Sequence, residues 1–436
     1  MAAQTQSGIL FFLVGRLKRS LSPELKHRLS GLWRRLMFRT TVIAITGSMG
    51  KTTTKEILSL ALASQGKTLK TRYNQNGIEG VSRTLRSMRP WHKFAVIEVG
   101  TDSPGSLRPR ANLVRPDIAI MLCVAETHQN NFHNLENTAK EKSELLRALG
   151  PRGIAILNRD DPNVLAMAKL CPGKIHYFGT TDDSDFKATN AYSHWPEGLS
   201  FDFHNKTEQT HIKTQLLGNH WLTSTNAALA AASICGVPLS VAAESTAQVT
   251  AFSARLQPIR LPNGATFIRD EIHASITAYE AMMNVLINAD AKRKGVIIGG
   301  QTDSKKTPKQ RFRALGKEAA QHCDFVIFVG DHSHHGHRAA VSAGMDPAMC
   351  PYMFGIEQAA DWLKKELRDG DVVFMKGRVT EHLTRIMFAQ FGDIGCWKST
   401  CMIRHTCDSC PKLEPKFDLN ACLPDENSHP NLIAGK

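Results

Sequence analysis

The feature that most constrains the fold is the stretch Thr41–Gly66, where an apolar run is followed by a glycine-bounded loop and a helical pattern. "TVIAITG" is rich in β-branched residues and ends in glycine, which is typical of a buried strand. "KTTTKEILSLALASQG" has helical periodicity, and we expect its helix to stop at Gly66. The sequence therefore predicts a strand, a tight loop between Gly47 and Gly50, and a helix.

Further apolar runs follow at Phe94–Gly100, Asp117–Ala125 and Gly153–Asn158, separated by helical or loop segments such as the helix expected around Ala139–Leu149. Strands that alternate with helices form parallel sheets covered on both faces. We therefore expect an α/β fold whose central domain is built on a parallel sheet.

The loop of the first unit has the arrangement that phosphate binding requires. Glycines let backbone N–H groups approach phosphate oxygens, and the start of a helix adds positive potential. Lys51 would reach the β- and γ-phosphates, and the Thr52 hydroxyl could ligate Mg²⁺. The general pattern has a glycine where this chain has Ile45, so the loop is a shorter variant. The residues expected to bind the nucleotide here are Gly47, Ser48, Met49, Gly50, Lys51, Thr52 and Thr53.

A second α/β block follows a change in the pattern of polar and apolar residues. Residues Lys187–Gln215 are polar and alternating, as in antiparallel strands, and Ser224–Gly236 is an alanine-rich helical stretch. Apolar runs that predict strands then recur at Lys294–Gly300, Asp324–Gly330 and Asp371–Gly377. The expected organisation is a basic amphipathic segment at 1–40, a central ATP-binding domain at 41–254, a Rossmann-like domain at 255–394, and a cysteine-rich tail at 395–436.

Length and charge narrow the classes of function. The chain has 436 residues, more than one hydrophobic core usually serves, and a net charge of +14. Residues 1–40 hold eight Lys or Arg side chains against one acid, Glu24. This segment fits an anionic membrane surface, a partner protein, or a helix that packs its Leu, Trp and Phe side chains on the body. Nucleic-acid binding is disfavoured, because no aromatic platform for a single strand accompanies the charge.

No run reaches the roughly 20 apolar residues that a membrane-spanning helix needs. The run Gly8–Val14 is too short, and no small-residue cleavage site follows it, so a secretory signal is not expected. We therefore expect a reducing cytoplasmic location, with peripheral membrane association as a further option.

The loop "ITGSMGKTTTKE" resembles the P-loop of the Mur ligases, the ATP-dependent amide-bond enzymes of peptidoglycan synthesis. It is most similar to the branch that adds D-alanyl-D-alanine to a muramoyl tripeptide. Other stretches resemble the family in the same order over about residues 41–390. They are "YNQNGIEGVSRTL", "AVIEVGTDSPGSL", "PDIAIMLCVAETHQNNFHNLENTAKEKSELL", "LLGNHWLTSTNAALAAA", "SARLQPI", "FIRDEIHASITAYEAM" and "VVFMKGR".

The resemblance implies a metal-binding set beside the P-loop. Glu98 would bind Mg²⁺ together with Thr52, His128 would bind a metal, and Lys142 would be the lysine that the family often carbamylates. Lys51, His128 and Lys142 are then the expected catalytic residues. The alternatives are an ordinary loop histidine at His128 and a solvated helical lysine at Lys142. Glu98 is harder to explain as structure alone, because unpaired buried carboxylates are costly.

The resemblance also implies a nucleotide-binding set outside the P-loop. Asn226 would contact the adenine, Asp270 and His273 would contact the ribose and base, and Arg255 would begin the inter-domain linker. Two further residues match family motifs, His220 in support of the site and Lys376 on the last strand. The family's usual aromatic in this region is replaced by Ile272, and the asparagine after it by His273.

These residues predict a carboxylate–amine ligase that uses ATP to activate an acid as an acyl phosphate, which an amine then attacks. The expected cofactors are ATP and Mg²⁺, and the expected partners are small or peptide acid and amine substrates. The 40 residues before the first strand are too few for the family's UDP-binding domain, so the acceptor need not be UDP-linked. The alternative function is a non-catalytic ATP-binding scaffold with this fold.

The tail adds a cluster that the resemblance does not cover. Its four cysteines have four, five and two residues between them. Clustered thiolates suit Zn²⁺ or an iron–sulfur cluster, with free thiols or a redox pair as the alternatives. The expected ligands are Cys396, Cys401, Cys407 and Cys410.

Overall fold

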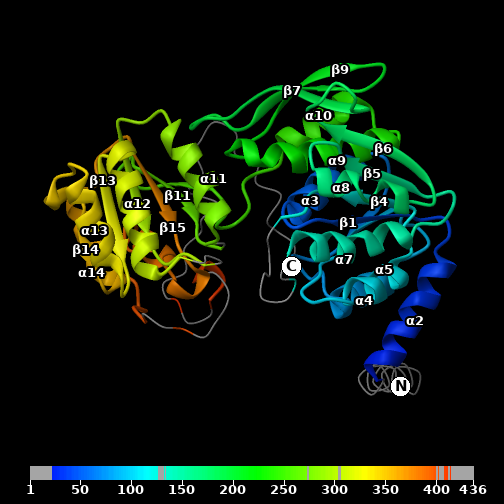
Figure 1. Ribbon diagram of the computed structural model, residues 1–436, viewed down its shortest axis with the longest axis horizontal. Helices are drawn as coiled ribbons and strands as arrows, with labels where there is room; N and C mark the ends of the chain where they lie inside the picture. Colours follow the sequence, from blue (N-terminus) through cyan, green and yellow to red (C-terminus); the bar gives the residue numbers. More distant parts are fainter. Residues whose placement is uncertain are drawn as a thin grey trace, which may run out of the picture. The chain divides into compact units, whose positions relative to one another are not determined.

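The computed structural model describes residues 22–125, 132, 134–272, 274–302, 306–398, 401, 407–410 and 413. The chain divides into two compact units (Figure 1). Unit 1 comprises Met1–Thr189, Asp202–His211 and Leu222–Thr246, and unit 2 comprises Asn190–Phe201, Ile212–Trp221 and Ala247–Lys436. The expected boundaries at residues 40, 254 and 394 stay a prediction.

The first sheet has nine strands in the order β2-β3-β1-β4-β5-β6-β7-β8-β9. The pairs from β2 to β7 are parallel, and Ile45 of β1 lies opposite Glu98 of β3 and Ile120 of β4. The strands are β1 (Thr41–Thr46), β2 (Thr68–Lys70), β3 (Phe94–Glu98), β4 (Ile118–Met121), β5 (Ile154–Asn158), β6 (Lys174–Gly179), β7 (Phe186–Tyr192), β8 (Ser200–His204) and β9 (Gln209–Lys213).

The helices of this part follow the expected alternation with strands. They are α2 (Pro23–Leu36), α3 (Lys51–Ala63), α4 (Ile78–Ser87), α5 (Leu107–Val114), α7 (Leu135–Arg147), α8 (Pro162–Leu165), α9 (Leu222–Ile234) and α10 (Leu239–Ala247). The inner strands are buried over almost their whole length, as expected for strands covered on both faces. The predicted parallel α/β sheet is confirmed. The helix expected to stop at Gly66 ends three residues earlier, at Ala63.

The second sheet lies in unit 2 and has six strands in the order β10-β11-β15-β12-β13-β14. All its pairs are parallel except β10 with β11. The strands are β10 (Gln257–Arg260), β11 (Thr266–Asp270), β12 (Arg293–Ile298), β13 (Phe325–Val329), β14 (Tyr352–Met353) and β15 (Asp371–Lys376). The helices are α11 (Ile276–Ile287), α12 (Pro308–His322), α13 (Ser333–Ser342), α14 (Ile356–Glu366) and α15 (Thr384–Phe388). Separate apolar clusters form on either side of this sheet.

Helix α2 packs on unit 1 through polar anchors as well as apolar contacts. The Trp33 indole N–H donates to the Met88 carbonyl at 3.0 Å, at the end of α4. Arg34 is buried and donates to the carbonyls of Val114 and Arg115 at 3.0 and 2.9 Å, at the end of α5. Helix ends leave carbonyls without partners inside the helix, so both side chains cap a neighbouring helix. The expected packing on the body is confirmed for Trp33.

None of the described helices is both long and apolar enough to cross a membrane.

Arg34 should be a stability anchor for α2. We expect Arg34→Met to lower the free energy of unfolding by about 2–3 kcal/mol, because the carbonyls of Val114 and Arg115 and the Asp117 carboxylate lose a charged donor at once. Its exposed neighbour supplies the control, since Arg35→Met should stay within about 0.5 kcal/mol of the wild type. Urea unfolding followed by circular dichroism measures both. Equal effects of the two substitutions would contradict the anchoring role.

Candidate functional site

The loop between β1 and α3 is built for close backbone approach. Gly50 is in the left-handed region at φ +82°, and a Cβ placed there would lie 2.3 Å from the Ser224 hydroxyl. Lys51 begins α3, and its ammonium donates to the carbonyls of Gly47 and Ser48 at 2.7 and 3.4 Å. The lysine thus folds back over the loop that it follows. No side chain other than glycine would fit at Gly50 without displacing α9.

Ser48 fixes the loop to the end of the neighbouring strand β4. Its backbone N–H donates to the Cys123 carbonyl at 2.8 Å, and its hydroxyl accepts from the Ala125 N–H at 2.9 Å. Met49 is half exposed at the tip of the loop. Two strands and a helix N-terminus therefore hold the loop backbone in one position.

A buried carboxylate lies beside the start of α3. Glu98, the last residue of β3, is 1% exposed, and its Oε2 accepts from the Thr52 hydroxyl at 3.0 Å. The Asn76 amide donates to its Oε1 at 2.7 Å, and the Lys55 ammonium lies 3.8 Å from Oε2. The hydroxyl and carboxylate oxygens of Thr52 and Glu98 are the hard ligands that Mg²⁺ takes. The two predicted Mg²⁺ ligands therefore do come together.

Lys142 lies in α7 within the same unit and is 3% exposed. Burial, reinforced by the nearby Lys51 ammonium, lowers the pKa of Lys142 to about 7. The preceding residue, Glu141, has its carboxylate held by the N–H groups of Gly105 and Leu107 at 2.7 and 2.6 Å. Lys142 is therefore a buried amine with a neighbouring cation, and the solvated helical lysine is ruled out as its environment.

Two of the five buried polar side-chain atoms in unit 1 that lack a partner among the described residues belong to residues predicted to bind the nucleotide. They are the Thr53 hydroxyl in α3 and Oδ1 of Asn226 in α9, whose amide N–H₂ donates to the Gly179 carbonyl at 3.1 Å. Buried polar groups are rarely left unsatisfied, so each such atom indicates a missing partner. A nucleotide with a phosphate chain and an amino-bearing base supplies both kinds of partner. The residues present therefore fit ATP and Mg²⁺.

Three predicted residues come together in unit 2, at the end of β11. The Lys376 ammonium donates to the Asp270 carboxylate, and Arg255 is close enough for its charge to act on both. Burial raises the pKa of Asp270, and the Lys376 charge opposes that shift. Ala254 and Leu256, on either side of Arg255, have φ of +54° and +50°. Left-handed backbone at non-glycine residues is strained, and such strain is typical of functional segments.

Three predicted site residues remain, His220, His128 and His273, and the structure describes only the first of them. His220 lies in a 3₁₀ turn, Asn219–Trp221, with its ring centroid 4.6 Å from that of Trp221. Ile272, which replaces the expected aromatic, lies after the end of β11. His128 and His273 lie outside the described residues, so their roles stay predictions.

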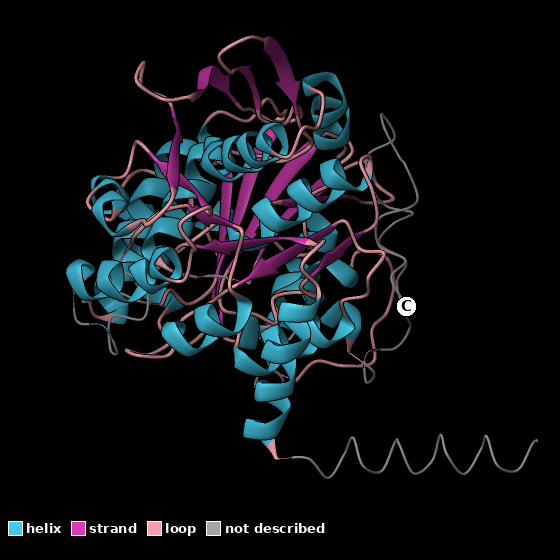
Figure 2. Cartoon of the chain, turned by 90° about the vertical axis from the view of Figure 1, so that its right-hand side faces the viewer, coloured by secondary structure: helices cyan, strands magenta, loops and turns pink. Residues whose placement is uncertain are grey.

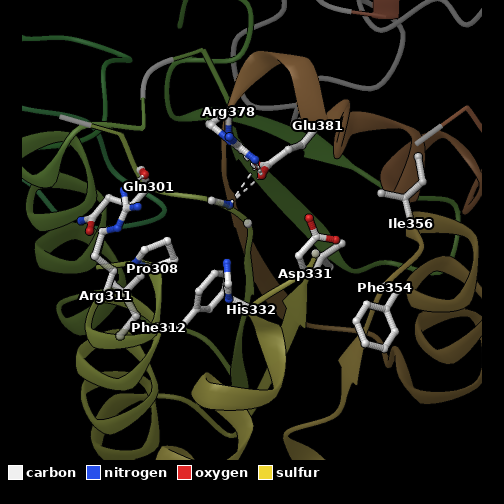
Figure 3. A pocket seen from close by; sticks show the side chains of 15 residues that line it. Gln301, Pro308, Arg311, Phe312, Asp331, His332, Phe354, Ile356, Arg378 and Glu381 are labelled. Atoms are coloured by element: carbon white, nitrogen blue, oxygen red, sulfur yellow. Dashed lines mark hydrogen bonds and ion pairs between the residues drawn. The ribbon is translucent and has the colours of Figure 1, made fainter. Parts of the chain in front are cut away.

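A pocket of about 550 Å³ opens at the carboxyl ends of β12, β13 and β15 in unit 2 (Figure 3). Arg311 and Gln301 line one side, Asp331 and Phe354 the other, and His332 lies between them. The carboxyl edge of an open parallel sheet is where α/β folds bind ligands. The Nε–H of Arg311 is buried and has no hydrogen-bond partner among the described residues.

The rim of this pocket is held by a closed polar network. The Glu381 carboxylate accepts from the Gly300 N–H at 2.9 Å, from the Arg378 backbone N–H at 2.8 Å and from its guanidinium at 2.7 Å. Glu381 is thereby engaged within the protein, while the Arg311 guanidinium donates to the Gln301 carbonyl and its Nε–H has no partner among the described residues. The pocket therefore suits a ligand that carries a hydrogen-bond acceptor such as a carboxylate.

The predicted metal cluster of the tail is not supported. No group of three or more His, Cys, Asp or Glu side chains that could hold a metal occurs among the described residues, which include Cys396, Cys401, Cys407 and Cys410. All four are free thiols.

In the structure an arginine, Arg385, contacts the tail cysteines that the sequence suggested as metal ligands. The buried Arg385 guanidinium donates to the Cys407 sulfur at 3.4 Å and to the carbonyls of Cys396 and Lys398 at 3.2 and 2.7 Å. A cation already bound to the sulfur competes with a metal for it. The described part of the tail, including Cys396, Cys407 and Leu413, therefore packs on the apolar cluster beside α14 and α15.

Sequence reasoning missed several residues of these sites. Asn76 and Lys55 hold Glu98, although neither stands in the phosphate loop. Their only signal was position: Asn76 lies in the "YNQNG" stretch already linked to the family, and Lys55 lies one turn into α3. Arg311 and Glu381 carried no signal, because single charged residues in a helix and a loop are usually solvated.

Comparison with known proteins gives the family. Residues 45–233 match the Mur ligase middle domain, and residues 254–379 match the domain described as Mur ligase, glutamate ligase domain. The UDP-N-acetylmuramoyl-tripeptide–D-alanyl-D-alanine ligase of Escherichia coli K12 is 31% identical over 307 residues, 69% of this chain and 67% of that protein. The Bacillus subtilis protein of the same name is 29% identical over 261 residues, 60% of this chain and 56% of that protein.

Solved structures agree with this result. MurF from Acinetobacter baumannii superimposes with a TM-score of 0.76 at 25% identity, covering 84% of this chain and 80% of that one. MurF from Thermotoga maritima, solved with ADP, has a TM-score of 0.72 at 20% identity and covers 85% of this chain and 83% of that one. The chain belongs to the Mur ligase family, as its motifs predicted.

Proposed function

We propose that the protein is an ATP-dependent ligase that joins a carboxylic acid to an amine through an acyl phosphate. A carboxylate oxygen of the acid attacks the γ-phosphorus of ATP, and ADP leaves. The amine nitrogen then attacks the acyl carbon, the new C–N bond forms, and phosphate leaves while the amine loses a proton. The observation that carries the proposal is the buried Thr52–Glu98 pair at the start of α3, directly behind the phosphate loop.

The residues of unit 1 supply what phosphoryl transfer needs, which is positioning and positive charge. Lys51 is the cation that would follow the γ-phosphoryl group, because it begins α3 and its ammonium lies against the carbonyls of the phosphate loop. Mg²⁺, when held by Thr52 and Glu98, would neutralise phosphate charge. Asn76 and Lys55 keep the Glu98 carboxylate oriented for that role. A scaffold that merely holds ATP would not need this set.

The pocket in unit 2 is the proposed site of the amine substrate. Its free donor at Arg311 favours an amine that also carries a carboxylate, such as an amino acid or short peptide. D-alanyl-D-alanine, named for the E. coli and B. subtilis relatives, has that chemistry and is the first amine to test, with the UDP-linked tripeptide as the first acid.

A substrate screen separates the ligase from the scaffold. ADP release should require both an acid and an amine, with UDP-muropeptides tested beside free amino acids and peptides. A scaffold would release none with any pair, and a nucleic-acid motor would require a polynucleotide instead.

Loss of Lys51 should stop turnover. We expect Lys51→Ala to lower the rate of ADP formation by at least about 100-fold, because a charged group on the transferred phosphoryl is lost. Lys67→Ala, at an exposed lysine just beyond α3, should leave the rate unchanged. Full activity of Lys51→Ala would refute the phosphate site.

Lys142 should carry a carbamate. A pKa of about 7 leaves about half of the amine neutral at neutral pH, against on the order of one in a thousand for an ordinary lysine. Only the neutral amine attacks CO₂, forming an N–C bond and releasing a proton. We therefore expect a ¹³C carbamate signal in ¹³C-bicarbonate that grows as the pH rises through 7 and fades below it.

The neighbouring lysine gives the control for this signal. Lys142→Arg should remove the carbamate resonance, and Lys140→Arg, at an exposed position of α7, should keep it. A signal that survives Lys142→Arg would assign the carbamate elsewhere.

Arg311 should select the amine. We expect Arg311→Gln to raise KM for the amine about 10- to 100-fold, because a hydrogen bond between charged groups contributes about 1.5–3 kcal/mol, while KM for ATP stays constant. Arg311→Lys should raise KM for the amine less than Arg311→Gln does. Arg313→Gln, at an exposed position on the same helix, should leave KM for the amine unchanged. An equal rise in KM for ATP would indicate a structural role instead.

A further inference from the structure

Helix α2 turns a row of leucines away from unit 1. Its inner face carries Ser30, Trp33 and Arg34, which contact α4 and α5 or the loops that follow them, and it runs along the outside of the unit (Figures 1 and 2). The outer leucines follow one another at intervals of four, three and four residues, which places them on one side of a helix. This leucine stripe comprises Leu25 and Leu29, each 42% exposed, Leu32, 54% exposed, and Leu36, 63% exposed.

Cations border the leucine stripe. Arg28 and Arg35 are exposed on α2 itself, and Arg39 is exposed just beyond its end. Phe38, 78% exposed, extends the apolar surface, and the Arg39 guanidinium lies 5.9 Å from the centre of its ring. Glu24, at the first turn, is the only acid among residues 1–40. The exposed face is thus both apolar and strongly positive.

We propose that the leucine stripe docks the protein on an anionic lipid surface, with α2 lying in the plane of the interface. Helices of this kind insert their leucine and phenylalanine side chains at the boundary of the acyl chains, while Lys and Arg contact the headgroups. Arginine side chains suit this position because their stems are apolar and their charged ends reach outward.

Charge complementarity decides against a second copy as the occupant. If α2 paired with itself, the leucines would fill the a and d positions of a coiled coil. The flanking e and g positions would then be Lys26, Arg28, Trp33 and Arg35, without an acid to pair with them. Two copies would bring like charges together over a helix of 14 residues, which is short for a coiled coil. An anionic surface meets the same cations with opposite charge.

Vesicle flotation of the full chain tests the proposal. The protein should float with vesicles of phosphatidylcholine mixed with phosphatidylglycerol and stay behind with phosphatidylcholine alone. Raising the salt from about 0.1 to about 1 M shortens the screening length from about 10 to about 3 Å, so it should weaken the binding. Leu29→Glu with Leu32→Glu should abolish flotation and leave ATP turnover in solution unchanged, because both side chains are outside the catalytic machinery and exposed.

Variants that remove positive charge from α2 measure the electrostatic contribution to vesicle binding. Each Lys or Arg near an anionic surface contributes about 1 kcal/mol, so Arg28→Gln with Arg35→Gln should weaken vesicle binding about 30-fold. Arg313→Gln with Lys317→Gln removes the same charge from exposed positions of α12 and should change it little.

Three outcomes would overturn the proposal. They are equal flotation with neutral and anionic vesicles, wild-type flotation of the leucine variant, and a concentration-dependent dimer in sedimentation that the leucine variant loses. The last outcome would assign the stripe to a second copy of the chain.

Discussion

The structure of unit 1 depends on one buried charge, the carboxylate of Glu98 at the carboxyl end of β3. A carboxylate that is 1% exposed is tolerated only when its oxygens have partners, and here Thr52, Asn76 and Lys55 provide them. These partners come from α3 and from the loop before α4, so satisfying one charge fixes the start of a helix and a loop together. The same arrangement holds an oxygen pair next to the phosphate loop, which is what a magnesium nucleotide requires.

In unit 2, buried charged groups also need partners at the edge of the sheet, and here the buried groups are an arginine and a lysine. Arg269 of β11 is fully buried and donates to Glu271 and, at 3.2 Å, to Asp408 of the tail. The next residue, Asp270, pairs with Lys376 of β15. Charges thus collect where parallel strands end, because strand ends free backbone groups and direct side chains toward one edge. The pocket beside Arg311 lies along this edge, at the ends of the three neighbouring strands.

Much of the fold could be predicted from the sequence, because a run of β-branched residues that ends in glycine rarely forms anything other than a strand. Every strand expected from such a run is present, to within a few residues at its ends. The phosphate loop was recognisable because its residues are consecutive. Asn76 and Arg311 were not, since Asn76 acts through a contact with Glu98 on another element and Arg311 through its place in a pocket at the ends of several strands. The metal site predicted at the cysteine cluster is not supported, for the same reason. The spacing of the cysteines shows that the thiols are near one another in sequence, but it does not show that the Arg385 guanidinium donates to the sulfur of Cys407.

The tail is therefore better understood through its acid than through its cysteines. Arg269 has five N–H donors and is fully buried, so Glu271 alone cannot satisfy it. Asp408 supplies the second carboxylate and also accepts from the Ser253 hydroxyl at 2.8 Å, in the segment that leads to the strained backbone around Arg255. Removing the tail would leave a buried cation with half of its compensation, directly beside Asp270. Asp408, in the described part of the tail, therefore belongs to the charge balance around Arg269 in unit 2.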